Sequence, residues 1–282
     1  MKISVIIPTY NCAQSLLEAI ESVLNQSFKD YEIIVIDDGS QDETKNVIDS
    51  YMKNICYIYQ QNQGVACARN LGIKKAQGKY IAFLDADDIW IKDKLKMQIE
   101  CFEKYPEIGL VFSDLIILNE NKEEKEYKIG NFKKDVEALI QHNFIPTSKV
   151  MVKKECFEKV GMFENFNLAE DYNLWLKIIQ HYSIYHIPQC LVKYKNKIRT
   201  KSYLLQTTIN EIKIISNITL KNKFIIKRKL GQLFYMAGLF SHQLKKYNQS
   251  QKYFIQSILK MPFYWRTYFY IFLNLIKNKK GF

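Results

Sequence analysis

The chain has 282 residues, of which 48% are hydrophobic and 14% aromatic, and this composition excludes a disordered or a fibrous protein. Its net charge is +12, but residues 193–282 hold 19 basic residues and one acidic residue, whereas residues 1–192 hold 22 basic and 28 acidic residues. An acidic first two-thirds with a net charge of −6 is therefore followed by a basic last third with a net charge of +18.

The first predicted element is a strand, Ile3–Ile7, in an apolar run that ends at Pro8. This run is too short for a secretory signal and is unlike a targeting peptide. No stretch of the chain reaches about 18 uncharged apolar residues, so a membrane-spanning helix is not expected.

Short apolar runs then alternate with amphipathic helical patterns through the acidic part of the chain. The predicted strands are Ile3–Ile7, Tyr31–Ile36, Ile55–Tyr59, Tyr80–Leu84 and Leu110–Ile117. The predicted helices are Gln14–Asn25, Glu43–Met52, Val65–Ala76 and Lys92–Tyr105. This alternation predicts an α/β fold with a mainly parallel, doubly wound sheet, in which ligands bind at the carboxyl ends of the strands.

Three of these strand ends carry unusual polar loops. Residues 8–11 read Pro-Thr-Tyr-Asn, residues 37–40 read Asp-Asp-Gly-Ser, and residues 85–88 read Asp-Ala-Asp-Asp. None of them has the glycines of a dinucleotide fingerprint, and the chain has no Walker pattern. Nicotinamide, flavin and P-loop nucleotide sites are therefore disfavoured.

Asp85 and Asp87 follow the fourth predicted strand directly, two residues apart. Carboxylate oxygens of this kind suit a hard divalent ion, which usually keeps several waters and takes its other ligands from substrate phosphates. The alternative is a solvated acidic loop that caps the helix near Lys92. The recurrence of acid clusters at two strand ends of one sheet favours the ligand site.

The second loop and Arg69 each have two interpretations. Asp37 and Asp38 could belong to an ordinary turn, with Asp42 capping the next helix, or could accept hydrogen bonds from a base or a ribose. Arg69 could reach an anionic ligand from the first turn of its helix, or could form a surface salt bridge.

A further acidic pair, Glu170 and Asp171, begins a helical pattern about 80 residues beyond Asp87. Acidic residues in a first helical turn commonly favour the helix dipole. A carboxylate at this point is also a candidate general base, provided that folding brings it near a metal-bound phosphate.

Six cysteines are scattered along the chain without a CxxC pair. This distribution fits a reducing cytoplasm better than a disulfide framework or a zinc site.

Taken together, these residues resemble the family 2 inverting glycosyltransferases, whose nucleotide-binding α/β domain is known as the glycosyltransferase A fold. Five blocks match in order across roughly residues 1–195, which is far more specific than any single pair of aspartates. The blocks are VIIPTYN (5–11), EIIVIDDGS (32–40), QGVACARNLGI (63–73), GKYIAFLDADDIW (78–90) and GMFENFNLAEDYNLWLKI (161–178). The expected domains are a catalytic domain, 1–195, and a basic helical extension, 196–282.

The resemblance implies a nucleotide-binding role for five side chains. Pro8 and Tyr10 would frame the nucleobase, and Asp38 would read a pyrimidine. Arg69 would lie near the nucleotide, and Asp85 would contact the ribose or the metal sphere.

The resemblance also implies the reaction and its catalytic groups. Asp87 would hold a Mn²⁺ or Mg²⁺ ion that bridges the donor diphosphate. Asp171 would be the general base, with Glu170 orienting it or binding the acceptor. The expected reaction is inverting transfer of a sugar from a nucleotide-diphosphate donor, expected to be a UDP-sugar, to a hydroxyl of a glycan or lipid-linked acceptor.

One segment departs from the family pattern. Many members carry a histidine followed by a serine in a basic segment beyond the last strand, whereas residues 194–202 read YKNKIRTKS. Lys197, Arg199 or Lys201 could supply the missing contact to diphosphate or metal, so none of them is assigned.

The basic extension has a helical pattern that loosely resembles one tetratricopeptide-type hairpin. The residues at matching spacings are Phe234, Gly238, Tyr247, Ser250, Phe254, Ser257 and Pro262. A single hairpin cannot bury its apolar face alone, so it is expected to pack on the catalytic domain or on a partner.

The aromatic segment from Pro262 to Ile276 is flanked by lysines and has two equally weighted interpretations. It could lie on an anionic membrane surface, which would make the protein peripheral at the cytoplasmic face, or it could be a buried terminal helix of the hairpin. Nucleic-acid binding is not expected, because no recognisable nucleic-acid-binding module accompanies the charge.

Two other functions are compatible with parts of the sequence. A phosphatase with an aspartate nucleophile fits less well, because neither acidic loop has the DxDG-like spacing. A non-catalytic sugar-nucleotide-binding or membrane-associated scaffold protein would bind a nucleotide without transferring or hydrolysing a donor.

Overall fold

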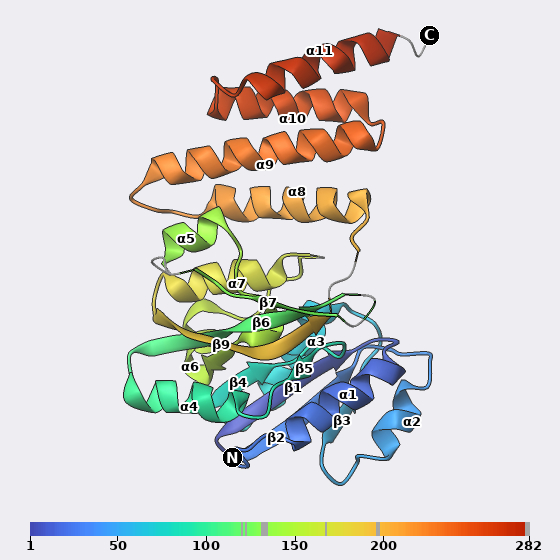
Figure 1. Cartoon of the computed structure of the whole chain (residues 1–282), viewed down its shortest axis with the longest axis vertical. Coiled ribbons are helices and arrows are strands. Elements are labelled where there is room, and N and C mark those ends of the chain that lie inside the picture. The colour runs from blue at the N-terminus through green and yellow to red at the C-terminus, as the bar shows by residue number, and fades with distance from the viewer. Residues whose placement is uncertain (120, 122, 131–134, 167, 196–197, 280–282) are drawn as a thin grey trace. The chain divides into compact units, whose positions relative to one another are not determined.

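Figure 1 shows the computed structural model of the chain, which describes residues 1–119, 121, 123–130, 135–166, 168–195 and 198–279. It divides into two compact units, residues 1–139 with 143–197 and residues 140–142 with 198–282. Lys197, one of the three cations considered above, lies outside the described residues.

The first unit is built on a sheet in which nine strands are described, in the order β3-β2-β1-β4-β8-β6-β9-β5, with β7 beside β6. Strands β1 to β4 pair in parallel, as do β6 and β9, whereas β8 is antiparallel to both of its neighbours. The fold is therefore α/β with a mixed, mostly parallel sheet, as predicted. The strands are β1 (Ile3–Thr9), β2 (Tyr31–Asp37), β3 (Cys56–Tyr59), β4 (Tyr80–Phe83), β5 (Ile89–Trp90), β6 (Ile108–Leu118), β7 (Glu124–Tyr127), β8 (Met151–Lys153) and β9 (Ser183–Lys195).

Helices cover the sheet because its strands carry apolar side chains on both faces. Ile3, Val5 and Ile7 of β1 join a core cluster with apolar side chains of α1 and α4, whereas Ile6 faces α3. The helices of this unit are α1 (Ala13–Leu24), α2 (Thr44–Asp49), α3 (Val65–Lys75), α4 (Lys94–Lys104), α6 (Lys154–Val160) and α7 (Glu170–Ile179), with α5 (Val136–Gln141) shared between the two units and a short 3₁₀ helix, η1 (Thr147–Lys149).

Close packing of α3 on β1 depends on Gly72. A Cβ atom at this position would lie 2.5 Å from Cγ2 of Ile6, which no side chain tolerates without a shift of the strand or the helix. Glycine therefore lets α3 lie against the sheet, and this sets the depth of Arg69 one turn earlier on the same helix.

The second unit is helical, with α8 (Lys201–Asn217), α9 (Lys223–Gln243), α10 (Tyr247–Lys260) and α11 (Trp265–Lys279) running alongside one another (Figure 1). Small residues let α9 and α10 form a tight hairpin, because Ser250 and Ser257 donate hydrogen bonds to the backbone oxygens of Gly238 and Gly231. Among the described residues, no helix is both long and apolar enough to cross a bilayer.

Candidate active site

The loops after β1 and β2 are bonded to each other at the carboxyl edge of the sheet. The register pairs Thr9 with Asp37, so both loops leave the sheet at the same level. The backbone N–H of Asn11 donates to Ser40 Oγ at 3.0 Å, and Asn11 Oδ1 accepts from the N–H of Gln41 at 2.8 Å. Gly39 has a φ of +86°, where a side chain would be strained, so the turn between them requires glycine.

Asp38 is buried, and its carboxylate organises the segment that leads into α3. Its Oδ1 accepts hydrogen bonds from Gln60 Nε2 at 2.6 Å and from the N–H of Gln63 at 2.9 Å, and its Oδ2 accepts from the N–H of Gly64 at 2.9 Å. A carboxylate has about four acceptor positions, so one position is left for a ligand. The predicted role of Asp38 in reading a pyrimidine stays a prediction.

Asp42 caps two helices rather than one. Its Oδ1 accepts from the N–H of Thr44 at 3.1 Å, which begins α2 as the sequence suggested. Its Oδ2 accepts from the N–H of Ala13 at 3.1 Å, the first residue of α1. The second loop is therefore part of the frame that holds the start of α1.

Pro8 and Tyr10 differ in what they offer to a ligand. Pro8 is buried within β1, whereas Tyr10 is 48% exposed at the start of the loop. Of the two residues predicted to frame a nucleobase, Tyr10 has the ring surface available for stacking.

Arg69 joins three elements that are far apart in the sequence. Its Nη2 donates to Asp85 Oδ1 at 2.7 Å, and its Nη1 donates to Glu170 Oε1 at 2.6 Å. The guanidinium also lies over the ring of Phe163, 5.3 Å from its centroid. Because Arg69 is only 3% exposed, the alternative of a surface salt bridge is wrong.

The charge state of Arg69 is fixed by its two partners. Burial lowers the pKa of its guanidinium, but attraction to Asp85 and Glu170 outweighs that effect, and the pKa is raised. Its Nε is buried and has no hydrogen-bond partner within the described part of the chain. An unpaired buried donor is costly unless a ligand completes it.

Asp171 follows Glu170 in the first turn of α7 and has the perturbed pKa expected of a general base. Burial, and then repulsion from Glu170, raise the pKa of its carboxyl from a usual 3.8 to about 7, while Arg69 and hydrogen bonds oppose the rise. Thr147 Oγ1 donates to its Oδ2 at 3.1 Å, and the N–H of Tyr172 donates to its Oδ1 at 2.6 Å. A carboxyl with a pKa in this range can accept and release a proton near neutral pH.

The turn before this acidic pair is held in an uncommon conformation. Ala169 has a φ of +68° and a ψ of +22°, in the left-handed region that residues other than glycine seldom adopt. Such backbone strain persists where surrounding structure enforces it, and it is concentrated at functional sites.

The 3₁₀ helix η1, which was not predicted from the sequence, connects the acidic loop after β4 with α7. Besides the bond from Thr147 to Asp171, Ser148 Oγ donates to Asp88 Oδ2 at 2.5 Å and accepts from the N–H of Asp85 at 3.0 Å. Adjacent side chains of one short turn thus hold the predicted base and the predicted metal loop. Their only sequence signal is a Thr-Ser pair after Pro146, which is too common to single out.

Asp88 is a structural member of the acidic loop. It is buried, accepts a second hydrogen bond from the N–H of Lys195 at 3.1 Å, and has a pKa raised by burial and then by the neighbouring charge of Asp85. Asp87, in contrast, lines an open hollow of about 560 Å³ beside the start of α1. None of the five predicted nucleotide-binding residues lines that hollow, so it does not by itself mark a donor site.

The donor set at this edge fits a divalent ion that is shared with a substrate. Within the described ranges there is no group of three or more His, Cys, Asp and Glu side chains that could hold an ion alone. Asp85 gives one oxygen to Arg69, and Asp87 is half-exposed, so the loop offers one or two carboxylates. Mg²⁺-type ions are commonly held by one or two carboxylates together with phosphate oxygens and water.

Comparison with known proteins identifies the family of the first unit. The family described as Glycosyl transferase family 2 matches residues 4–161 of the chain. The match ends before Glu170 and Asp171.

Three relatives extend this match. An uncharacterised glycosyltransferase of Rickettsia prowazekii is 35% identical over 199 residues, which cover 68% of this chain and 63% of the relative. One from Methanocaldococcus jannaschii is 32% identical and covers 87% of each chain. The Bacillus subtilis protein TuaG, named provisionally as a teichuronic acid biosynthesis glycosyltransferase, is 30% identical over 68% of this chain and 78% of its own length. The chain thus spans less than two thirds of the Rickettsia relative.

Two solved structures share the fold. Staphylococcus aureus TarS, residues 1–349, superposes with a TM-score of 0.69 and 18% identity over 93% of this chain and 81% of its own, and it has been solved with UDP and with UDP-GlcNAc. The mannosyltransferase PcManGT of Pyrobaculum calidifontis, solved with GDP-Man and Mn²⁺, superposes with a TM-score of 0.64 and 17% identity over 98% of this chain and 85% of its own.

Proposed function

The chain belongs to glycosyltransferase family 2, and on that premise we propose that it transfers a sugar from a nucleoside-diphosphate donor to an acceptor hydroxyl with inversion. One observation carries the proposal. Arg69 bonds Asp85 of the acidic loop to Glu170, the neighbour of a carboxyl whose pKa is about 7. Glycosyl transfer needs a base that accepts the acceptor's proton and a site that stabilises the leaving diphosphate. A carboxyl with that pKa, linked to the acidic loop, would meet both needs.

Asp171 acts as the general base in this proposal. Its carboxylate takes the proton of the acceptor hydroxyl while that oxygen forms a bond to the anomeric carbon. The bond from the anomeric carbon to the donor phosphate breaks on the opposite face, and the electron pair leaves with the nucleoside diphosphate. One base and one displacement give inversion, by the same geometry as in inverting glycosidases.

Thr147 and Glu170 position the base. The hydroxyl of Thr147 donates a hydrogen bond to Oδ2 of Asp171 and so restricts the rotation of the carboxylate. The charge of Glu170 raises the pKa of Asp171, while Glu170 itself is paired with Arg69. The two neighbouring carboxyl groups therefore have different roles: Glu170 holds Arg69, and Asp171 accepts the proton.

Asp87, with Asp85, would hold a Mn²⁺ or Mg²⁺ ion, which when bound supplies positive charge to the leaving diphosphate. The unpaired Nε of Arg69 supports an anionic ligand near the same loop. Tyr10 and Asp38 would bind the base, and a UDP-sugar is the proposed donor because the TarS structures contain UDP and UDP-GlcNAc.

The acceptor is proposed to be a glycan or lipid-linked hydroxyl in polysaccharide synthesis, by analogy with the name of TuaG. The proposed location is the cytoplasm, which the six free cysteines support.

A nucleotide panel tests this function. UDP, GDP and dTDP would each be added with and without Mn²⁺, and the melting temperature measured. At about 100 times its dissociation constant a ligand stabilises the fold by about 2.7 kcal/mol, so the correct nucleotide is expected to raise the melting temperature clearly. No shift with any nucleotide would contradict donor binding, and a shift without donor hydrolysis or transfer would favour a non-catalytic binding protein.

A further inference from the structure

Helix α11 presents one face that no described residue of its own unit covers. Six large apolar side chains lie on it, each between 39% and 69% exposed. At 100° per residue they fall within an arc of about 120°. They are Trp265, Tyr268, Phe269, Phe272, Leu275 and Ile276, which we call the α11 face.

The opposite side of α11 accounts for the packing of the helix. Thr267 and Asn274 are fully buried, and Asn274 Nδ2 donates to Ser250 Oγ of α10 at 2.8 Å. Tyr270 stacks on Phe254, with ring centroids 5.4 Å apart. These contacts hold α11 on the hairpin by one side, as the interpretation of a terminal helix of the hairpin expected, and the α11 face lies outside this packing.

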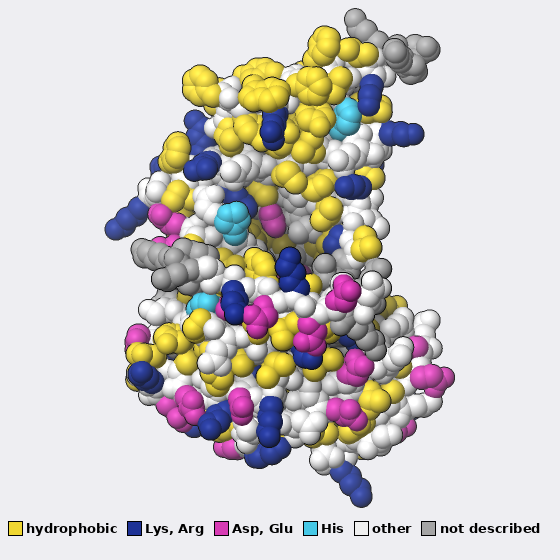
Figure 2. Space-filling model, in the orientation of Figure 1, with side chains coloured by type: hydrophobic (Ala, Val, Ile, Leu, Met, Phe, Trp, Pro, Cys, Tyr) yellow, Lys and Arg dark blue, Asp and Glu magenta, His cyan; other side chains and the backbone are white. Residues whose placement is uncertain are grey.

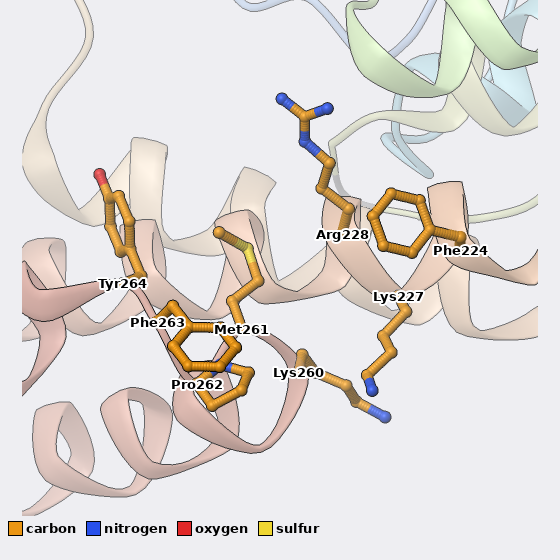
Figure 3. Close-up of a pocket in the computed structure, with 8 residues that line it drawn as sticks. All are labelled: Phe224, Lys227, Arg228, Lys260, Met261, Pro262, Phe263 and Tyr264. Atoms are coloured by element: carbon orange, nitrogen blue, oxygen red, sulfur yellow. The ribbon is translucent and has the colours of Figure 1, made fainter.

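A basic hollow of about 490 Å³ adjoins the start of α11 (Figure 3). Its cations are Lys227 and Arg228 of α9 and Lys260 of α10, and its apolar lining includes Phe224, Pro262 and Phe263. In Figure 3 the ends of the Lys227 and Lys260 side chains lie near each other and away from Pro262 and Phe263, whereas Arg228 extends to the opposite side. Phe263 itself is 97% exposed.

The charges of this unit have almost no internal counterions. Residues 198–282 contain 16 Lys and Arg residues and one acidic residue, Glu211. Glu211 is already coupled to Lys229, because each affects the pKa of the other. Carboxylates of the unit therefore offer Lys227, Arg228 and Lys260 almost no competition for an external anion.

We propose that the α11 face and the basic hollow together form a docking surface for an anionic lipid bilayer. The aromatic rings and aliphatic side chains of the face would enter the headgroup region, and the three cations of the hollow would bind lipid phosphates. Hydrophobic side chains gather over α11 in Figure 2, at the top of the view, with Lys and Arg side chains among them.

Charge and composition favour a bilayer over a protein partner. Trp, Tyr and Phe beside Lys and Arg are typical of segments that lie in the membrane interface, where aromatic rings sit at headgroup depth and cations meet phosphate. A second copy that docked through its own α11 face would bring a second basic unit, with 16 more cations, to the same contact, which is unfavourable. This surface would serve a lipid-linked acceptor, but it does not rest on the proposed function.

Vesicle co-sedimentation of the full chain tests the proposal. One vesicle population is phosphatidylcholine alone, and the other contains about one part in four of phosphatidylglycerol. The wild type is expected to sediment with the anionic vesicles and to be released by salt. The face variant, Trp265→Ser with Phe269→Ser and Phe272→Ser, is expected to bind at least roughly tenfold more weakly, because it loses three inserted rings.

Two further variants separate charge from apolar contact. Lys227→Glu with Lys260→Glu is expected to lower binding to anionic vesicles by roughly tenfold and to leave binding to neutral vesicles unchanged. The matched control, Met52→Ser with Tyr127→Ser, removes exposed apolar side chains of the first unit and is expected to bind as the wild type does.

The outcomes are distinguishable from those of the nucleotide panel, because these variants leave every residue of the acidic loops unchanged. Wild type that stays in solution with both vesicles would overturn the proposal, as would a face variant that binds as tightly as the control. A wild type that is dimeric by light scattering, made monomeric by the face variant, and that does not bind vesicles would instead assign the face to a second copy.

Discussion

The two units of this chain handle charge in opposite ways. In the first unit a few acidic groups are buried or half-buried, and of these Asp38, Asp85 and Glu170 each accept hydrogen bonds from backbone N–H groups or from Arg69. In the second unit the charges are cations, and a single acidic residue accompanies them. Buried, paired charges hold catalytic side chains in fixed positions, whereas unpaired surface cations can attract an anionic partner. Substitutions in the two units should therefore differ in how much activity or stability they remove.

Asp171→Asn is expected to have the largest effect on activity. Losing a general base costs about 10²- to 10⁴-fold in rate, while donor binding should be retained because the acidic loop is untouched. Donor hydrolysis and transfer would be measured alongside UDP binding. The control, Glu164→Gln, alters an exposed carboxyl in the same segment; a fully active Asp171→Asn enzyme would remove Asp171 from the role of base.

Arg69→Met is expected to have the largest effect on stability. It would leave Asp85 and Glu170 without their buried partner, which should lower the free energy of unfolding by about 3–5 kcal/mol. Urea denaturation measures this. Lys2→Met, which breaks an exposed pair with Glu103, should cost about 1 kcal/mol or less, and an equally small loss for Arg69→Met would contradict the role of the buried pairs.

Thr147→Val is expected to have a moderate effect on the base. Removing a hydrogen bond to the ionised carboxylate raises the pKa of Asp171 and frees its rotation, so activity at neutral pH should fall by roughly tenfold. Thr147→Ser keeps the hydroxyl and should restore most of the rate. An unchanged pH profile for the valine variant would show that Thr147 has only a packing role.

Lys227→Glu with Lys260→Glu is expected to have the smallest effect on stability. Because no carboxylate of the unit pairs with the exposed Lys227 or the half-buried Lys260 in the described structure, the free energy of unfolding should change by no more than about 0.5 kcal/mol. Urea denaturation would compare it with Arg69→Met. A loss of several kcal/mol would mean that the basic hollow is part of the fold rather than a free surface.

Most of the sheet could be predicted from the sequence because its strands are strongly apolar. The five predicted strands match β1, β2, β3, β4 and β6, each end within two residues. Strand β9 was not predicted, because Pro188 interrupts its pattern and its pairing with β6 shifts register. Strands β5 and β8 have two and three residues, too few for any periodicity to indicate them.

The acidic residues of the candidate site could be predicted from the sequence, but the hydrogen bonds and ion pairs that join them could not. Arg69, Asp85 and Glu170 are each visible as a motif, but their contact joins positions up to 101 residues apart, which spacing cannot reveal. Thr147, Ser148 and Asp88 became recognisable only through their hydrogen bonds. Likewise, the sequence left α11 open between a segment on a membrane surface and a buried terminal helix, and the structure shows a helix that is buried on one side, at Thr267 and Asn274, and exposed on the other.

The pH dependence of donor turnover tests the central claim most directly. Because Asp171 must be ionised to accept a proton and its pKa is about 7, kcat/KM should rise with pH through about 7 and fall as the pH drops below it. The Asp171→Asn variant should lack this step. A wild-type rate that stays constant between about pH 5 and pH 8 would contradict a base that titrates near neutrality.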